Sequence, residues 1–178
     1  MAEAFSNKVA RASGIVTSTT GGAIGITTNL ITGISTVHVA VNDLVDTGNF
    51  ILGTKVTNIG VSSVTCDRDS TNTAAATNQS VKFLGVTTAY TSTGTKSILV
   101  GGTFANNTTS SVNLTVQVWD NSASTEVALA GKIPVPNGSS FVITDAGKTV
   151  LESSDEIRIY CDTANAIDAT LSILTGVS

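Results

Sequence analysis

The fold is decided by the stretch Val112-Asn-Leu-Thr-Val-Gln-Val-Trp119, in which apolar and polar side chains alternate. Leu114, Val116 and Val118 fall on one side of an extended chain, and their polar neighbours fall on the other side. This period of two residues is typical of a β-strand with one buried face. The same alternation returns at Glu156–Asp162. We therefore predict an antiparallel sheet that packs on a core with one side and meets water with the other.

Six strands of this kind are predicted in the second half of the chain. Turn-forming residues such as Pro136-Asn-Gly138 separate them, and no helical periodicity intervenes. Strands that follow one another in this way favour an antiparallel β-sandwich over an α/β sheet. The predicted strands are Lys96–Asn106, Val112–Trp119, Thr125–Ile133, Ser139–Thr144, Glu156–Asp162 and Asp168–Leu174.

The first half of the chain contains shorter β segments and begins with a stretch that has no periodicity. Residues 1–13 are predicted to be an N-terminal arm, and Asp67–Ser80 is predicted to be a surface loop. The expected strands are Ile15–Thr19, Ala23–Thr27, Thr36–Val41, Lys55–Ile59, Ser63–Asp67 and Val81–Leu84.

The predicted fold class is all-β, with two small antiparallel β domains after the arm. The first domain is expected at residues 14–85. The second, at residues 86–178, is expected to be an Ig-like or jelly-roll-like β-sandwich.

The amino-acid composition supports an all-β chain and argues against nucleic acid and membranes as its partners. Charged residues make up only 12% of the chain, about half the usual share, while hydrophobic residues reach 41%. The net charge is −4, so no basic face is expected to bind nucleic acid, and no basic cluster points to a membrane. The N-terminus lacks the pattern of a secretion signal, so we expect synthesis and persistence in a cytoplasm.

The two cysteines and the single histidine are the residues most able to carry chemistry. Cys66 and Cys161 lie far apart in sequence; a disulfide between them is left open, although reduced thiols are expected in a cytoplasm. A metal site with His38 would need three distant segments to meet, without any close ligand pair. His38 is therefore expected to be a surface or interface residue.

Acidic residues give two further candidates. Asp67, Asp69 and Thr71 have the spacing that opens a calcium loop, but the glycine and glutamate that complete the loop are replaced by Asn72 and Asn78. A solvated turn is the better interpretation of this segment.

The carboxylate pairs Asp145/Glu152 and Asp155/Glu156 could be compared with glycosidase pairs. However, the sequence gives no apolar pocket to raise a pKa, and aromatic residues are only 4% of the chain. The glycine pair Gly101-Gly102 lies inside a predicted strand, where it indicates a bulge or a close backbone approach. We therefore assign no catalytic, cofactor-binding or metal-binding residue and no cofactor, and we do not expect an enzyme.

Several segments resemble a small β-sandwich module of tailed-bacteriophage virion proteins. The most specific are Ile133-Pro-Val-Pro-Asn-Gly-Ser-Ser-Phe-Val-Ile143 and Gly147-Lys-Thr-Val-Leu-Glu152. In the first half, Ile31–Val37 and Gly53–Gly60 are similar to short modules in structural proteins of T4-like phages of cyanobacteria.

The resemblance implies a viral structural protein that is made in the bacterial host and located in the virion. The favoured role is a capsid decoration or cement protein that binds the major capsid protein or other virion subunits, as a homo-oligomer. A neck, tail or fibre-attachment component is the alternative, followed by a receptor-binding or glycan-binding module. A glycan site would need clustered aromatic residues, and Tyr90, Trp119 and Tyr160 are scattered.

Overall fold

The chain is built from β-strands, turns and loops. The computed structural model describes residues 3–94, 96–144 and 148–177, and within these ranges it contains no helix. The predicted all-β fold is therefore confirmed. Since the described residues form no helix at all, none of them forms a helix that could cross a membrane.

The chain divides into two compact units. One, the sandwich unit, consists of Met1–Gly14 together with Thr87–Ser178, and the other, the inserted unit, is Ile15–Val86. The sandwich unit therefore begins with the first strand of the chain and resumes after the inserted unit. The predicted end of the first domain, residue 85, lies next to the end of the inserted unit at Val86, and the predicted arm, residues 1–13, falls within the sandwich unit.

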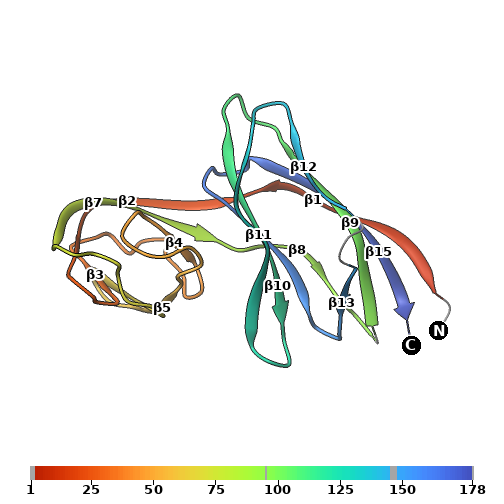
Figure 1. Cartoon of the computed structure of the whole chain (residues 1–178), viewed down its shortest axis with the longest axis horizontal. Helices are drawn as coiled ribbons and strands as arrows, with labels where there is room; N and C mark the ends of the chain where they lie inside the picture. Colours follow the sequence, from red (N-terminus) through yellow and green to blue (C-terminus); the bar gives the residue numbers. More distant parts are fainter. Residues whose placement is uncertain (1–2, 95, 145–147, 178) are drawn as a thin grey trace. The chain divides into compact units, whose positions relative to one another are not determined.

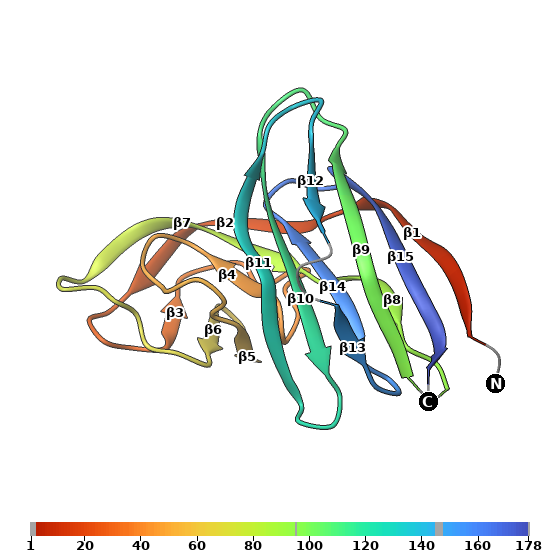
Figure 2. The same cartoon turned by 45° about the vertical axis from the view of Figure 1, so that its right-hand side comes forward.

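The sandwich unit consists of two antiparallel sheets. One has five strands in the order β1-β15-β9-β12, with β13 also paired to β9, and the other has four strands in the order β11-β10-β14-β8. The first and last strands of the chain lie side by side in both views (Figures 1 and 2). The strands are β1 (Ala4–Ser13), β8 (Thr87–Thr91), β9 (Lys96–Asn106), β10 (Val112–Asp120), β11 (Thr125–Val135), β12 (Ser140–Ile143), β13 (Thr149–Leu151), β14 (Glu156–Cys161) and β15 (Ile167–Val177).

The strand order is that of a jelly roll. If β12 and β13 are taken as one interrupted strand, one sheet contains the first, last, third and sixth strands of the unit. The other sheet contains the second, seventh, fourth and fifth strands. Such interleaving of early and late strands over two sheets defines the jelly roll. The prediction of a β-sandwich is confirmed, and its six predicted strands all form close to their expected bounds.

Alternate side chains from both sheets form the core of the sandwich unit. Leu114 and Val116 on β10, Ile157 and Ile159 on β14, and Leu171 on β15 are all fully buried. Each such side chain contributes about 1.5–3 kcal/mol on leaving water. The alternation that identified these strands in the sequence is therefore the alternation between core and outer face.

Residues Ala4–Ser13 form strand β1 and not an arm. They pair antiparallel with β15 from Ala4 opposite Thr175 to Ala10 opposite Ala169. The strand escaped prediction because it lies at the edge of its sheet, where Phe5 faces outward and only a few positions touch the core. An edge strand such as β1 buries little apolar surface, so apolar and polar residues need not alternate along its sequence.

The inserted unit is a single six-stranded sheet in the order β4-β7-β2-β3-β6-β5. Ile24, Ile31, Val56, Val64 and Phe83 are almost completely buried in its core. The strands are β2 (Ile15–Ile24), β3 (Leu30–Thr32), β4 (Leu44–Asp46), β5 (Val56–Ile59), β6 (Ser63–Cys66) and β7 (Ala76–Gly85).

The predicted strands Ile15–Thr19 and Ala23–Thr27 are parts of one strand, β2, which ends at Ile24, and the short strands β3 and β4 were not predicted.

Two further expectations for the strands and loops of this unit are wrong. The segment Thr36–Val41 is a turn in which His38 has φ 64° and Val37 is 64% exposed. Asp43 holds the turn, because its carboxylate accepts a hydrogen bond from the Ala40 N–H (2.8 Å). In addition, the predicted loop Asp67–Ser80 ends before residue 76, where β7 begins. The alternation of Val37, Val39 and Val41 therefore predicted a strand at a place where the chain forms a turn.

Gly14, at the junction of the two units, permits a close approach that no other residue would allow. Its φ is +122°, and a Cβ atom there would lie 2.4 Å from the carbonyl oxygen of Thr163. We expect Gly14→Ala to lower the free energy of unfolding of the sandwich unit by about 3 kcal/mol, because it adds a steric clash to backbone strain. Chemical denaturation followed by tryptophan fluorescence would measure the loss, because Trp119 lies in this unit.

Gly138→Ala is the matched control. Gly138 also has a positive φ, +66°, but nothing lies within 4 Å of a Cβ there. In the control, the free energy of unfolding should fall by only about 1 kcal/mol, which is the cost of placing an alanine in the left-handed backbone conformation. Equal losses for the two variants would show that the contact with Thr163 is unimportant.

Candidate functional site

The acidic pair Asp155/Glu156 serves structure. The carboxylate of Asp155 accepts hydrogen bonds from the backbone N–H groups of Asn121 (3.0 Å) and Glu152 (2.8 Å). Glu156 accepts a hydrogen bond from the guanidinium of Arg158 (2.7 Å). The two carboxylates thus have different partners and do not form a catalytic pair. Asp145, the partner proposed for Glu152, lies outside the described residues, as do Ala146 and Gly147.

The segment compared with a calcium loop is held by backbone contacts. Asp67 accepts a hydrogen bond from the Lys55 N–H (2.8 Å), and the Thr71 hydroxyl donates to the Asn49 carbonyl (3.3 Å). Across the described ranges, no three His, Cys, Asp or Glu side chains are grouped so that they could hold a metal ion. His38 is exposed in its turn, as a surface histidine would be.

The two cysteines are buried thiols, one in each unit, and no disulfide joins them. Burial, together with the negative charge of the nearby Asp67, raises the pKa of the Cys66 thiol to about 12. A thiol with this pKa is protonated at neutral pH and is a poor nucleophile.

The glycine pair in β9 has the structural role that its position predicted. The pairing of β9 with β15 shifts register next to Gly101, which marks a bulge. A Cβ at Gly101 would lie 3.1 Å from the Ile143 carbonyl oxygen, and one at Gly102 would lie 2.9 Å from Leu171. Both interpretations of the pair, a bulge and a close approach, are therefore confirmed.

A charged cluster on the outer face of the four-stranded sheet was missed in the sequence. Arg158 on β14 pairs with Glu126 on β11 and with Glu156, and it stacks over the Trp119 ring at 4.4 Å. The Glu126 side chain is only 1% exposed. Burial, together with the charge of Glu126, raises the pKa of the neighbouring Tyr160 hydroxyl. Because Glu126 and Arg158 are far apart in sequence, only the pairing of β10 with both strands could reveal the cluster.

This cluster stabilises the sheet and offers no catalytic group. Both carboxylates are engaged by the same guanidinium, so the contacts of the cluster are directed within the sheet. A carboxyl group with a raised pKa does occur at Asp43, where the cause is burial, but its oxygen is engaged with the Ala40 N–H. Among the described side chains around Arg158 and around Asp43, we find no acid paired with a nucleophile.

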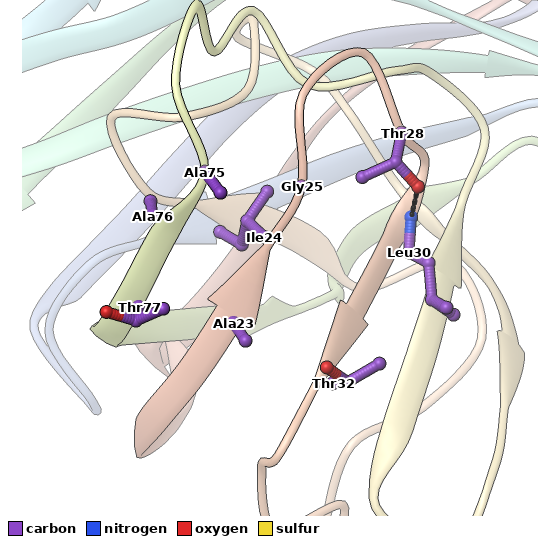
Figure 3. A pocket seen from close by; sticks show the side chains of 9 residues that line it. All are labelled: Ala23, Ile24, Gly25, Thr28, Leu30, Thr32, Ala75, Ala76 and Thr77. Carbon is purple, nitrogen blue, oxygen red and sulfur yellow. Dashed lines mark hydrogen bonds between the residues drawn. The ribbon is translucent and has the colours of Figure 1, made fainter.

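The inserted unit carries a hollow of about 330 Å³ at one end of strands β2, β3 and β7 (Figure 3). The side chains that line it are short, and none is charged or aromatic. The backbone N–H of Leu30 donates to the Thr28 hydroxyl at its rim (3.3 Å). Small-molecule sites normally combine aromatic walls with a few convergent polar groups, whereas this lining has no aromatic side chain and only threonine hydroxyls as polar side-chain groups. The residues are Ala23, Ile24, Gly25, Thr28, Leu30, Thr32, Ala75, Ala76 and Thr77.

The outer face of the five-stranded sheet is the better candidate for a functional surface. The register aligns Phe5 with Leu174, Leu174 with Ile98, and Ile98 with Val150, so one apolar row crosses four strands. Phe5 is 74% exposed and Val150 is 52% exposed. We call this the apolar row.

A second row on the same face runs from Val9 through Thr170 and Thr103 to Val142. Val9 is 74% exposed and Val142 is 47% exposed. No residue of either row is charged. Large apolar side chains aligned on a solvent-facing sheet are characteristic of a binding surface.

Comparisons with known proteins give little guidance. No family model matches the chain, and no curated protein matches it. A solved structure of infectious bursal disease virus, Gx strain, is similar with a TM-score of 0.36 and 8% sequence identity, and the match covers 96% of this chain and 70% of that chain. A likeness of this degree carries no argument about fold or function, so the argument that follows rests on the chain itself.

The charged cluster gives a prediction about stability. Arg158→Ala should lower the free energy of unfolding by about 3–5 kcal/mol, because the buried Glu126 carboxylate would lose its guanidinium. Lys96→Ala is the control, because Lys96 pairs with Glu152 at 3.6 Å in a bridge that is at least half exposed on both sides. The Lys96→Ala substitution should lower the free energy of unfolding by only about 0–1 kcal/mol. Urea denaturation of both variants would test this, and similar small losses would mean that the cluster is dispensable.

Proposed function

We propose that the chain is a viral structural protein, and in particular a decoration or cement protein on the head of a bacteriophage. The observation that carries the proposal is the apolar row on the outer face of a jelly-roll sheet. Jelly rolls are recurrent in viral capsid domains, although a fold alone does not define a function. The segments that resemble phage virion modules support the same role.

The proposed mechanism is binding without chemistry. The outer face of the five-stranded sheet docks on the capsid shell, and its low charge keeps the desolvation cost of that contact small. Many symmetric copies then add weak contacts into strong attachment. The major capsid protein is the proposed partner, and we expect copies of the chain to associate with one another as well. The location is the virion, after synthesis in the bacterial cytoplasm.

The number of copies in purified particles distinguishes the head from the neck or tail. Decoration predicts on the order of hundreds of copies in a regular array on the shell, as icosahedral symmetry requires. Mass spectrometry of particles and cryo-electron microscopy would measure number and position. Copies confined to one vertex would favour the neck or tail alternative, and absence from the particle would overturn the proposal.

The apolar row predicts which substitution weakens attachment. Val150→Lys places a charge in the middle of the proposed contact, and we expect it to reduce binding to undecorated particles at least about tenfold. Co-sedimentation of purified protein with particles would measure the affinity.

Val61→Lys is the matched control, because Val61 is 99% exposed but belongs to the inserted unit. It should leave binding unchanged. A loss of affinity for Val61→Lys together with normal binding for Val150→Lys would move the contact away from the apolar row.

A further inference from the structure

Strand β1 ends its sheet and leaves one side of its backbone without a partner strand. In the sheet order it is followed only by β15, and none of the backbone hydrogen bonds found in the described ranges joins residues 4–12 to another strand on the open side. Figure 2 shows β1 as the outermost strand beside β15. A free strand edge of this length is a template for another strand.

We infer that β1 pairs antiparallel with β1 of a second copy, about a two-fold axis at Asn7, so that two five-stranded sheets become one continuous sheet. This inference deepens the self-association in the proposed function, but it concerns the chain alone and needs no particle. In an isologous contact, each pair of residues occurs twice.

The outward-facing side chains of β1 select this register. With Asn7 opposite Asn7 of the copy, Phe5 lies opposite Val9, and both side chains are 74% exposed in the single chain. Glu3 lies opposite Arg11 and provides charge complementarity at both ends of the contact. Directly opposed apolar and oppositely charged pairs each stabilise an antiparallel ladder.

The inward-facing side chains agree with the same register. Lys8 is exposed, and lysine on an edge strand usually discourages pairing. Here it would lie opposite Ser6 of the copy, a small uncharged residue, so the register centred on Asn7 opposes no like charges at Lys8. A hollow of about 210 Å³ lined by Phe5, Ser6, Asn7 and Ser172 lies at the centre of the contact.

The neighbouring registers lose these pairs. A shift that centres the axis on Lys8 opposes two ammonium groups and places Phe5 against Arg11. A shift that centres it on Ser6 places Glu3 against Val9 and leaves Phe5 opposite Asn7. Since like charges or an unmatched carboxylate oppose pairing, only the register centred on Asn7 satisfies both the apolar and the charged side chains.

The pairing also extends the candidate functional surface. The apolar row of one copy, which ends at Phe5, would continue into the Val9 row of the other copy. Both copies would therefore present one uninterrupted, nearly uncharged band on the same face of the joined sheet, which matches the band that the proposed capsid contact needs.

Sedimentation and cysteine trapping of the purified full chain test the inference. We expect a concentration-dependent dimer, and we expect Asn7→Cys to form an intermolecular disulfide under mild oxidation, because residues opposed in a ladder come within disulfide distance. Ser6→Cys and Lys8→Cys are the controls and should not cross-link, since neither opposes itself. The native thiols are buried and should not interfere.

Charge reversal gives an independent readout. Glu3→Arg should raise the dimer dissociation constant about tenfold, since it replaces two attractions per dimer by repulsions, and adding Arg11→Glu should restore it. A chain that stays monomeric at all concentrations overturns the inference. Cross-linking at Ser6→Cys or Lys8→Cys in place of Asn7→Cys overturns the register, and a dimer that none of the three traps overturns the use of this edge. None of these results decides by itself whether the chain attaches to particles, because the copy number in particles tests attachment separately.

Discussion

The structure of the sandwich unit depends on the burial of every second side chain between its two sheets. Leu114, Val116, Ile157 and Ile159 face the core from one sheet and Leu171 faces it from the other, so the chain neighbours of these residues must face outward. The interior therefore determines which residues are available at the surface. Along the two rows of the five-stranded sheet these outward positions carry valine, leucine, isoleucine, phenylalanine and threonine, and these uncharged side chains create the candidate functional surface.

The outer faces of the two sheets of the sandwich unit differ in how their side chains are paired. On the four-stranded sheet, Arg158 gathers Glu126, Glu156 and Trp119 into a compact cluster. This arrangement satisfies the charges within the chain and leaves little for a partner to bind. The five-stranded sheet has no such cluster along its two rows, so its apolar side chains remain available. A division of this kind between a self-contained face and an open face fits a protein that binds on one side.

Periodicity in the sequence predicted most of the longer strands, and it missed the short strands β3, β4, β8 and β13, which have too few residues to show a period. The strands β9, β10, β11, β12, β14 and β15 were all expected from the apolar residues along them. The edge strand β1 was missed because it buries little, and the turn around His38 was taken for a strand because its valines alternate by chance. The pair Glu126 and Arg158, and the alignment of Phe5 with Val150, depend on strand register. Register comes from pairing over long sequence distances, so no local pattern reveals it.

The position of the first strand has a consequence for folding in the cell. Strand β1 is synthesised before the other described strands, yet its partner in the sheet, β15, is the last of these strands to be synthesised. The inserted unit, whose strands pair only with one another, has its complete set of contacts long before that moment. We therefore expect the inserted unit to fold during translation, while β1 waits with both edges open. The exposed apolar side chains Phe5 and Val9 and the absence of proline in Ala4–Ser13 leave this nascent strand able to pair with neighbouring chains, and chaperone binding at that stage would protect it.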